Sequence, residues 1–346
     1  MAKRPTIRDL AEASGVSAAT VDRVLNGRTS VRTATALRVL DTARRIGFHA
    51  TPLLQQRIGG EKPALVAGLI LPGTEREFYA HFQAEAEKAA RAFPRSQIKL
   101  IVDFLPSITP VEIVAKMEAM AARTQAIGLV SIDHPRITEE VERLRENGIP
   151  VFALLSDFAQ GAREAYIGTN NLKVGRTAAS MLARGIPKQS ESAEVALFVG
   201  GHRWHGHELR ETGFRVWFRQ NRPEISILST LVNLDTAELT YEATLSLISR
   251  HPRLAAIYCA GGGREGVINA VRDEGHIGRI DVVANEFTEV TKRAMTDGAV
   301  SLVINTPARA IMHAFYDMAL DAVTGEPGHS PGQVFLQTDL ILPESF

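Results

Sequence analysis

The sequence has little of what secreted, membrane-spanning or disulfide-bonded proteins require. One cysteine, Cys259, stands among 346 residues, which excludes an intrachain disulfide framework. No apolar run approaches the roughly 20 residues that a membrane-spanning helix needs. The beginning, MAKRPTIRDL, has no apolar signal core, which a secreted or periplasmic protein would need. We therefore expect a cytoplasmic globular protein with no membrane partner.

Motifs of catalysis and of metal binding are also missing. The sequence has no G-x-S-x-G elbow, no phosphate-binding P-loop and no zinc-finger pattern. His202, His205 and His207 crowd one segment, but their spacing does not fit a helical metal pair and no cysteine is near them. Cys259 ends an apolar run, which favours a buried small hydrophobe over a nucleophile. We therefore expect no catalytic residue, no metal and no cofactor.

Net charge is absent as well, but the charges are unevenly distributed. The 39 basic and 39 acidic residues give a formal charge of zero. Residues 1–57 hold ten Lys or Arg and four Asp or Glu, a charge of +6, which leaves −6 on the remainder. A basic N-terminal segment on an acidic body fits a polyanion-binding module joined to a second unit.

The basic segment has the pattern of a helix-turn-helix. Thr6 can cap a first helix, and Ser17 can cap a second. Gly15 permits the positive φ of a tight turn between them. A third helix is expected over roughly residues 32–46, where apolar residues recur at helical spacing. An ordinary three-helix bundle is the alternative, but the charge and the turn together favour DNA binding.

In a helix-turn-helix the second helix enters the major groove by its N-terminal residues. Arg23 can bond a guanine edge through O6 and N7, and Ala18 and Ala19 can touch thymine methyls or simply allow close approach. Asp22 repels phosphate unless it accepts from a cytosine amino group or pairs with a neighbouring Arg. The polar residues expected to bond phosphates are Thr6, Ser17, Thr20, Asn26, Thr29 and Ser30.

A family resemblance rests on these same residues. T-I-R-D-L-A-E-A-S-G-V-S-A-A-T-V-D-R-V-L-N-G-R, residues 6–28, resembles the signature of the LacI/GalR family of transcription regulators, and the likeness continues through R-R-I-G-F, residues 44–48. The resemblance implies a homodimer, or a tetramer, on a near-palindromic operator, and an effector domain similar to periplasmic sugar-binding proteins. The C-terminal tail carries no heptad extension, which favours the dimer.

Two positions depart from the family pattern. Asp22 stands where the family usually has Ser near the DNA backbone. In the linker, Arg57 falls where the family has the Leu of a hinge helix that wedges into the minor groove. Either Leu53, Leu54 or Ile58 serves as the wedge in a shifted register, or Arg57 enters the groove electrostatically.

Beyond the linker, apolar runs alternate with helical stretches such as residues 82–92, 110–122 and 138–147. The runs are residues 64–71, 98–104, 126–132, 150–155, 165–167, 194–199, 226–232, 255–259, 281–284 and 301–304. Their Val, Ile and Leu content is typical of parallel strands buried on both faces, so the pattern predicts a doubly wound α/β fold. About ten strands exceed one usual sheet, which predicts two lobes.

The fold class expected is therefore α/β, an all-α helix-turn-helix followed by a two-lobed parallel-sheet domain similar to periplasmic binding proteins. The domains are placed at residues 1–48 for the helix-turn-helix, 49–61 for the hinge or linker and 62–346 for the effector domain. The resemblance implies that the chain passes between the lobes about three times. The lobes are expected to hold approximately residues 64–163 plus 306–328, and 164–305 plus 329–343.

Ligands of such folds bind beyond the carboxyl ends of the strands. Polar and aromatic residues that suit a polyol follow several predicted strands, among them Asp133, Asp157, Arg203 and Trp204. By resemblance, Arg210 and Glu286 match the family's hydroxyl-binding positions, and Asn305 stands where Gln or Asp is frequent. Phe78 and Tyr79 resemble the stacking pair of ribose-type binding proteins.

One motif points to a different ligand. Residues 261–266, Gly-Gly-Gly-Arg-Glu-Gly, satisfy the dinucleotide fingerprint G-x-G-x-x-G after a predicted strand, and Glu286 lies at a suitable distance downstream. Against this reading, about seven predicted strands precede the motif, so it opens no domain.

The sequence predicts a transcription regulator, a repressor of a carbohydrate or polyol operon, controlled by a small sugar, sugar acid or cyclic polyol bound between two lobes. Operator DNA and that effector are the expected partners. Two alternatives stay open, a dinucleotide-sensing repressor and a carbohydrate enzyme fused to a DNA-binding head.

Overall fold

The computed structural model describes residues 5–26, 31, 33–51, 53–54, 64–73, 77–188, 192–325 and 332–346. The chain divides into two compact units, a head of residues 1–64 and a body of residues 65–346. Within the described ranges, no helix is long and apolar enough to cross a membrane.

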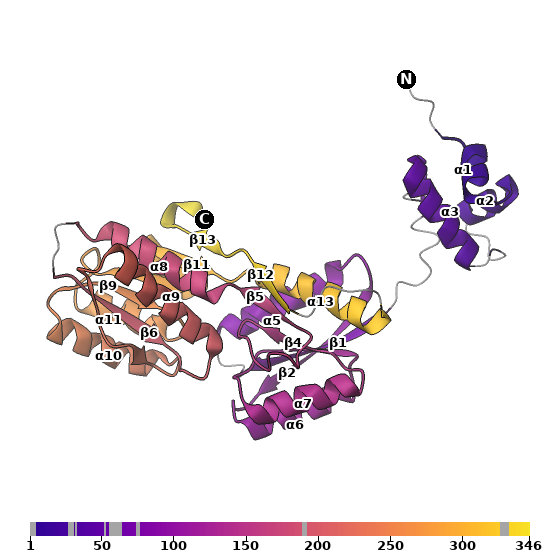
Figure 1. Ribbon diagram of the computed structural model, residues 1–346. Helices are drawn as coiled ribbons and strands as arrows, with labels where there is room; N and C mark the ends of the chain where they lie inside the picture. Colours follow the sequence, from indigo (N-terminus) through magenta and orange to yellow (C-terminus); the bar gives the residue numbers. More distant parts are fainter. Residues whose placement is uncertain are drawn as a thin grey trace. The chain divides into compact units, whose positions relative to one another are not determined.

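The head contains the three helices expected from the sequence (Figure 1). They are α1 (Ile7–Ser14), α2 (Ala18–Leu25) and α3 (Thr33–Ile46). Thr6 caps α1 in a capping box with Asp9, and the Ser17 hydroxyl caps α2 by accepting from the Thr20 amide at 3.1 Å. Gly15 ends α1 with φ of +66°, which a residue with a side chain adopts only at a cost. The predicted turn between the first two helices is confirmed.

A small apolar core holds these helices together. Its buried members are Leu10, Ala11, Val21, Val24, Leu25, Val39, Leu40, Ala43, Phe48 and Leu54. Leu54 is fully buried, and its amide donates to the Ala50 carbonyl at 3.0 Å. The suggestion that Leu54 wedges into a minor groove is therefore wrong for this conformation, since the head uses its side chain for packing. Leu53 stays exposed, and Arg57 and Ile58 lie outside the described residues.

The first lobe of the body is built on a sheet with strand order β12-β5-β4-β3-β1-β2. The strands are β1 (Ala64–Pro72), β2 (Gln97–Leu105), β3 (Ala126–Leu129), β4 (Val151–Leu154), β5 (Ala165–Thr169) and β12 (Gly332–Leu336). β3 pairs in parallel with β1 and β4, and β5 pairs in parallel with β4 and β12. Its helices are α5 (Glu77–Ala92), α6 (Pro110–Ala121), α7 (Pro135–Glu146) and α13 (Ala308–Thr324). Figure 1 shows α6 and α7 on one side of this sheet and α5 and α13 on the other.

The second lobe is built on a sheet with strand order β13-β11-β10-β9-β6-β7, in which β8 also pairs with β6. The strands are β6 (Glu194–Val199), β7 (Ser226–Ile227), β8 (Leu231–Val232), β9 (Leu254–Cys259), β10 (Asp281–Asn285), β11 (Leu302–Asn305) and β13 (Asp339–Ile341). The helices are α8 (Asn171–Gly185), α9 (His205–Asn221), α10 (Ala237–Arg250), α11 (Arg264–Asp273), α12 (Glu289–Thr296) and a final 3-10 turn, Pro343–Ser345. Two separate apolar clusters cover its two faces, one with α8 and α9, the other with α10, α11 and α12. The predicted doubly wound architecture is confirmed, although β13 runs antiparallel to β11.

The chain crosses between the lobes three times, after β5, after β11 and after β12. The number of crossings agrees with the sequence-based expectation, but two of their positions do not. We placed residues 164–169 and 329–336 in the second lobe, whereas β5 and β12 belong to the first sheet. The reason is strand pairing, because β5 continues the parallel ladder of β4 and then serves as the template for β12. The predicted run 226–232 also breaks into the two short strands β7 and β8.

Helix α8 packs closely on α9, the helix that carries Arg210. A Cβ built on Gly175 of α8 would overlap the backbone carbonyl of Arg210 in α9, and one on Gly213 of α9 would overlap the carbonyl of Leu172. Both positions therefore need glycine for the helix backbones to approach this closely. The position of the Arg210 backbone therefore depends on this approach.

We expect Gly175→Ala to destabilise the body by about 1–3 kcal/mol, because the added methyl must push α9 away. Gly73→Ala is the control, since its Cβ would meet only the Leu105 carbonyl at 4.0 Å. Urea unfolding followed by circular dichroism measures both. Equal midpoints for the two variants would contradict the packing argument.

Candidate functional site

A cavity of about 600 Å³ lies between the two lobes of the body, at the carboxyl ends of strands from both sheets. The first lobe lines it with α5, with residues that follow β3 and β4 and with the end of β5. The second lobe contributes the beginning of α9, the segment before α10 and the ends of β9, β10 and β11. This is the place where ligands of parallel α/β folds are expected.

Five of the nine predicted effector-binding residues line this cavity, and they come from both lobes. They are Phe78, Tyr79, Trp204, Arg210 and Glu286. Phe78 and Tyr79 meet edge to face, with ring centroids 5.1 Å apart. Trp204 precedes α9 in the second lobe, yet its side chain packs in the apolar core of the first lobe. Aromatic surfaces and ionic groups thus face one space, as a polyol site requires.

The other four predicted residues lie outside the cavity lining, so the prediction that they bind the effector is corrected. Asp133 accepts from the Ala159 amide at 3.0 Å, and Arg203 is exposed. The side-chain Oδ1 of Asn305 accepts from the Phe287 backbone amide at 3.1 Å. Asp133 and Arg203 follow strands as expected and Asn305 is the last residue of β11, but a position at the end of a strand does not determine which way a side chain turns.

Asp157 has a structural role in the first lobe. Its carboxylate is buried and receives the Arg163 guanidinium at 2.8 Å and the Gln333 amide at 2.9 Å. Arg163 also donates to the Gly332 carbonyl at 2.9 Å, so the pair ties the loop after β4 to the edge strand β12. A buried ion pair bonded in this way holds the sheet edge rather than a ligand.

A chain of hydrogen bonds orients Arg210 within the cavity. Its Nε donates to Asn171 Oδ1 at 2.7 Å, and its Nη1 donates to the Ala260 carbonyl at 2.6 Å. The Asn171 amide in turn donates to Tyr166 Oη at 3.3 Å, and that phenol donates to the Thr169 carbonyl at 2.9 Å. Burial raises the pKa of Tyr166 well above its usual range, so the phenol stays protonated as this chain requires.

Glu286, which directly follows β10 in the same lobe as Arg210, is held in an uncommon backbone conformation. Its φ is +71°, in the left-handed region that non-glycine residues seldom occupy. Its carboxylate is buried and accepts from the Thr306 hydroxyl at 2.7 Å. Leu155 and Asp235, which also line the cavity, have positive φ values of 65° and 57°. Backbone strain of this kind clusters at functional sites, where the surrounding structure sustains it.

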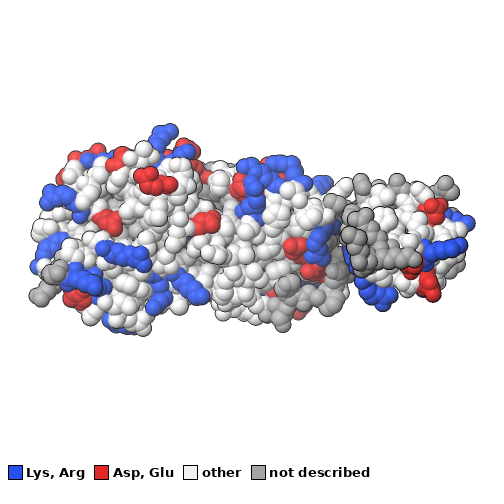
Figure 2. All heavy atoms as spheres, turned by 90° about the horizontal axis from the view of Figure 1, so that it is seen from above, with Lys and Arg blue, Asp and Glu red and all other residues white. Residues whose placement is uncertain are grey.

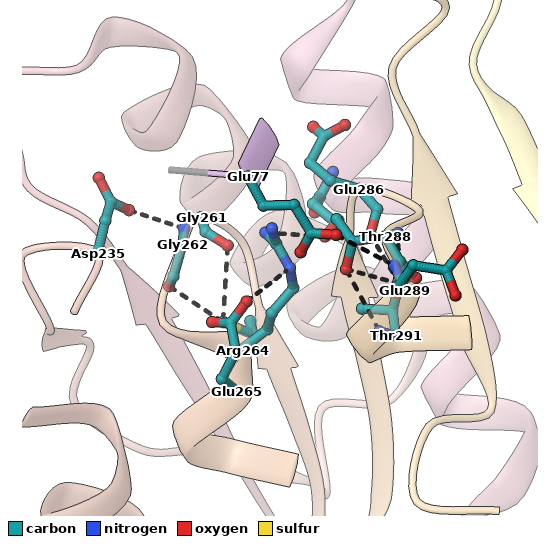
Figure 3. Close-up of polar contacts among 12 residues, drawn as sticks. Glu77, Asp235, Gly261, Gly262, Arg264, Glu265, Glu286, Thr288, Glu289 and Thr291 are labelled. Atoms are coloured by element: carbon teal, nitrogen blue, oxygen red, sulfur yellow. Dashed lines mark hydrogen bonds and ion pairs between the residues drawn. The ribbon is translucent and has the colours of Figure 1, made fainter. Parts of the chain in front are cut away.

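Arg264 is a cavity residue that sequence reasoning did not select. It begins α11 and is only 5% exposed. Its Nε lies 3.5 Å from a carboxylate oxygen of Glu265, and its Nη1 lies 3.5 Å from the Asn285 carbonyl (Figure 3). The signal was present in the sequence, because this arginine follows directly on three glycines after a strand.

The glycines of residues 261–266 contact another segment of the protein, Asp235 and the beginning of α10. Asp235 Oδ1 accepts from the Gly262 amide at 2.8 Å, as Figure 3 shows. A Cβ on Gly261 or Gly262 would come within 2.7 Å of Asp235, and one on Gly263 or Gly266 would overlap the segment that begins α10. The glycines are therefore explained by close packing of this loop on its neighbours, without a pyrophosphate.

Cys259 lies beneath the same loop, fully buried as predicted. Its Sγ contacts the Gly262 carbonyl oxygen at 3.5 Å. Burial raises the pKa of this thiol to about 12, which keeps it protonated near neutral pH.

Polar contacts also join the lobes across the cavity. Glu77, at the beginning of α5 in the first lobe, accepts from the Glu289 amide at the beginning of α12 at 3.3 Å (Figure 3). The Gly206 amide of α9 donates to the Ser156 hydroxyl of the first lobe at 3.2 Å. A ligand in this space is therefore next to the contacts that set the relation between the lobes.

In the head, α2 presents an exposed face of candidate DNA-binding residues. Ser17, Ala18, Ala19, Asp22, Arg23 and Asn26 are all exposed. Asp22 accepts from the Asn26 side-chain amide at 2.9 Å, so its local partner is an amide rather than the arginine we considered. The Thr6 and Thr20 hydroxyls take part in capping contacts. Thr29, Ser30 and Arg57 lie outside the described residues.

The described residues on one face of the body show no concentration of one charge (Figure 2). On the face shown in Figure 2, its basic and acidic side chains are interspersed, with broad uncharged stretches between them. Dispersed charge of both signs is ordinary for a soluble surface. The excess of basic residues therefore belongs to the N-terminal segment, 1–57.

Comparison with known proteins yields matches for both units. Residues 6–51 match the model of bacterial regulatory proteins of the lacI family, and residues 67–327 match that of the periplasmic binding protein domain. The maltose regulon regulatory protein MalI of Escherichia coli is 26% identical over 348 residues, covering 95% of each chain. The transcriptional regulator MalR of Streptomyces coelicolor is 26% identical over 344 residues, covering 95% of this chain and 93% of its own.

A solved structure supports the fold of the body. The solute-binding protein of an ABC transporter from Burkholderia graminis, in complex with D-arabinose, superposes with a TM-score of 0.73. It is 19% identical and covers 81% of this chain and 97% of its own length, so it shows the fold alone.

A helix-turn-helix head and a two-lobed body with a central cavity define a one-component, DNA-binding transcription regulator. The chain carries a lacI-type DNA-binding domain at residues 6–51, and its body, residues 67–327, belongs to the periplasmic binding protein domain family.

We expect Asp157→Asn to destabilise the body by roughly 3–5 kcal/mol, because it leaves the buried Arg163 guanidinium without its carboxylate. Asp317→Asn is the matched control, since Asp317 is 47% exposed where it meets Arg95 and such pairs contribute little. Thermal and urea unfolding compare the two. If both variants unfold like the parent protein, the structural role of Asp157 is refuted.

Proposed function

We propose that this protein represses a carbohydrate or polyol operon and that a small sugar-like effector in the interlobe cavity controls its hold on DNA. The observation that carries the proposal is the cavity itself, where Phe78, Tyr79, Arg210 and Glu286 converge from two lobes. Buried ionic groups hydrogen-bond hydroxyls, and aromatic faces cover the apolar faces of a sugar ring. The arabinose-bound structural neighbour and the relative MalI, which is named for a maltose regulon, support a saccharide ligand.

DNA recognition is assigned to the exposed face of α2. Arg23 bonds a guanine edge in the major groove, and Ala18 and Ala19 lie close to the neighbouring bases. Asp22 accepts from a cytosine amino group while Asn26 keeps its carboxylate in place, as their 2.9 Å contact allows. Thr6, Ser17, Thr20, Thr29 and Ser30 contribute phosphate contacts, and Arg57 acts in the minor groove.

The protein acts in the cytoplasm as a homodimer on a near-palindromic operator, which places two copies of α2 on adjacent half-sites. Effector binding changes the angle between the lobes and thereby the spacing of the heads. The ligand can shift this equilibrium only by its different affinity for the two states. Groups from both lobes lie beside the ligand, which provides a reason for such a difference.

Two other functions receive less support. A dinucleotide sensor would need the glycines of residues 261–266 for phosphate binding, whereas here they make room for Asp235 and the beginning of α10. An enzyme fused to a DNA-binding head would need a reactive group, and the relatives across nearly the whole chain are named as regulators.

Arg23→Ala is expected to weaken operator binding by roughly 1–3 kcal/mol and to relax specificity at one base pair, because a base-edge contact is lost. Arg91→Ala, which removes an exposed arginine from the body, removes the same charge as a control. Fluorescence anisotropy with operator and mutated duplexes at fixed salt measures both. An unchanged operator affinity in Arg23→Ala would refute the assigned contact.

Glu286→Gln should weaken effector binding roughly ten- to hundredfold, because a hydrogen bond to a charged group contributes about 1.5–3 kcal/mol. Glu289→Gln makes the same chemical change at an exposed position three residues away. Calorimetric titration of both variants with a panel of sugars, sugar acids and polyols provides the comparison. Equal affinity of the two variants would show that the ligand does not meet Glu286.

A further inference from the structure

Arg264 is a buried cation whose hydrogen bonding is incomplete. Among the described residues, its Nε has no hydrogen-bond partner. The nearest charged atom is a Glu265 oxygen at 3.5 Å, and its Nη1 reaches the Asn285 carbonyl only at 3.5 Å. An unmet donor on a buried charged group carries a desolvation cost, and such groups ordinarily have partners. The side chain lines the cavity, so a bound molecule can supply the missing acceptor.

The buried side chains of the cavity lining, which we call the deep wall, also carry a charge that favours an anion. Its buried ionic side chains are Arg210, Arg264 and Glu286, an excess of one positive charge. The two hydrogen bonds that orient Arg210 go to an amide oxygen and a carbonyl oxygen, which carry no formal charge. Acidic residues of the lining are more accessible, for Glu77 and Glu238 are exposed and Asp235 and Glu265 are half-buried. Water screens those charges, whereas it screens the buried ones much less.

Helix α11 adds to this charge, because Arg264 is its first residue. No described side chain caps the helix, and its N-cap is Gly263. The N-terminal amides of a helix carry a partial positive charge that stabilises anions. A ligand oxygen bonded to Arg264 lies next to this end of the helix.

From these observations we propose that the effector is a sugar acid, an aldonate or a uronate, whose carboxylate is received by Arg264 at the beginning of α11. This inference rests on the proposed function, which assigns a sugar-like effector to the cavity. One carboxylate supplies the hydrogen-bond acceptor that Arg264 Nε lacks, beside the positive end of α11. Arg210 and Glu286 then bind the hydroxyl groups, and Arg264 decides between an acid and its neutral counterpart.

The decisive experiment compares matched pairs of ligands on the full chain. D-glucose is titrated beside D-gluconate and D-glucuronate, D-galactose beside D-galactonate and D-galacturonate, and D-glucose 6-phosphate tests a more highly charged anion. Calorimetry and thermal shift are the readouts. The proposal predicts that at least one carboxylate binds tenfold or more tightly than its neutral partner and than the phosphate.

A neutral sugar, or the phosphate, that binds as tightly as its carboxylate counterpart overturns the sugar-acid inference and leaves the proposed function standing. Absence of binding by every member of the panel contradicts both the inference and the sugar-like effector of the proposed function. The two failures are therefore distinguishable.

Variants of α11 test the residue itself. Arg264→Gln should weaken binding of the carboxylate roughly ten- to hundredfold, the loss expected for a charged hydrogen bond, and change a neutral sugar's affinity much less. Arg272→Gln is the control, because Arg272 lies on the same helix and bonds Asp297 outside the cavity. Retained carboxylate affinity in a folded Arg264→Gln overturns the proposal. If that variant fails to fold, the comparison of carboxylate and neutral ligands on the parent protein still tests the proposal.

Discussion

The hydrogen bonds around Asn171 are the interaction on which the cavity most depends. This side chain begins α8, directly after the chain has left the first lobe, and it bonds Tyr166 of one lobe and Arg210 of the other. Its amide also approaches the Leu155 carbonyl at 3.3 Å. A single residue thus connects the first crossing, which follows β5, to the guanidinium that lines the cavity. Because the network is buried, loss of one hydrogen-bonding group leaves the others without partners. The free-energy cost of such a loss opposes partial rearrangement of the network.

Packing limits how this network can respond to a ligand. Arg210 lies on α9 where α8 approaches at the distance that Gly175 and Gly213 allow, so its backbone cannot shift toward α8 without moving that helix. Movement of the cavity wall is instead expected as rotation of the lobes, which are joined by three crossings and by contacts such as Glu77 with the Glu289 amide. Closely packed lobes tend to have discrete arrangements rather than a continuum. A ligand that spans both lobes can select one of these arrangements.

Much of this could be predicted from the sequence because the determining signals are local. Caps at Thr6 and Ser17 and the turn at Gly15 specify the head, and apolar runs identify most strands of the body. The exceptions have non-local causes. β12 is an edge strand with alternating exposure, so no continuous apolar run marks it. Its place beside β5 depends on residues far away in the sequence.

The site residues also divide into those that the sequence identified and those whose role depends on distant parts of the chain. Arg210 and Glu286 line the cavity, while Asp157 follows a strand equally well and instead pairs with Arg163. Only the fold brings Arg163 and Gln333 to Asp157, and nothing local in the sequence distinguishes its carboxylate from one that meets a ligand. Arg264 is the opposite case, a residue that lines the cavity although the sequence did not indicate it. The glycines before it resembled a phosphate loop, and its burial becomes visible only when α10 is seen packed against that loop.

Coupling between the cavity and the head is the central claim, and selection of DNA by the intact protein tests it most directly. Purified protein is incubated with a random duplex library, with and without sugar acids and neutral sugars, and the bound DNA is sequenced. The account predicts enrichment of a near-palindromic sequence whose recovery changes at least several-fold with one of the ligands, as expected for a coupling of about 1–3 kcal/mol. Failure to enrich any sequence over random duplex, under every ligand condition, would contradict it.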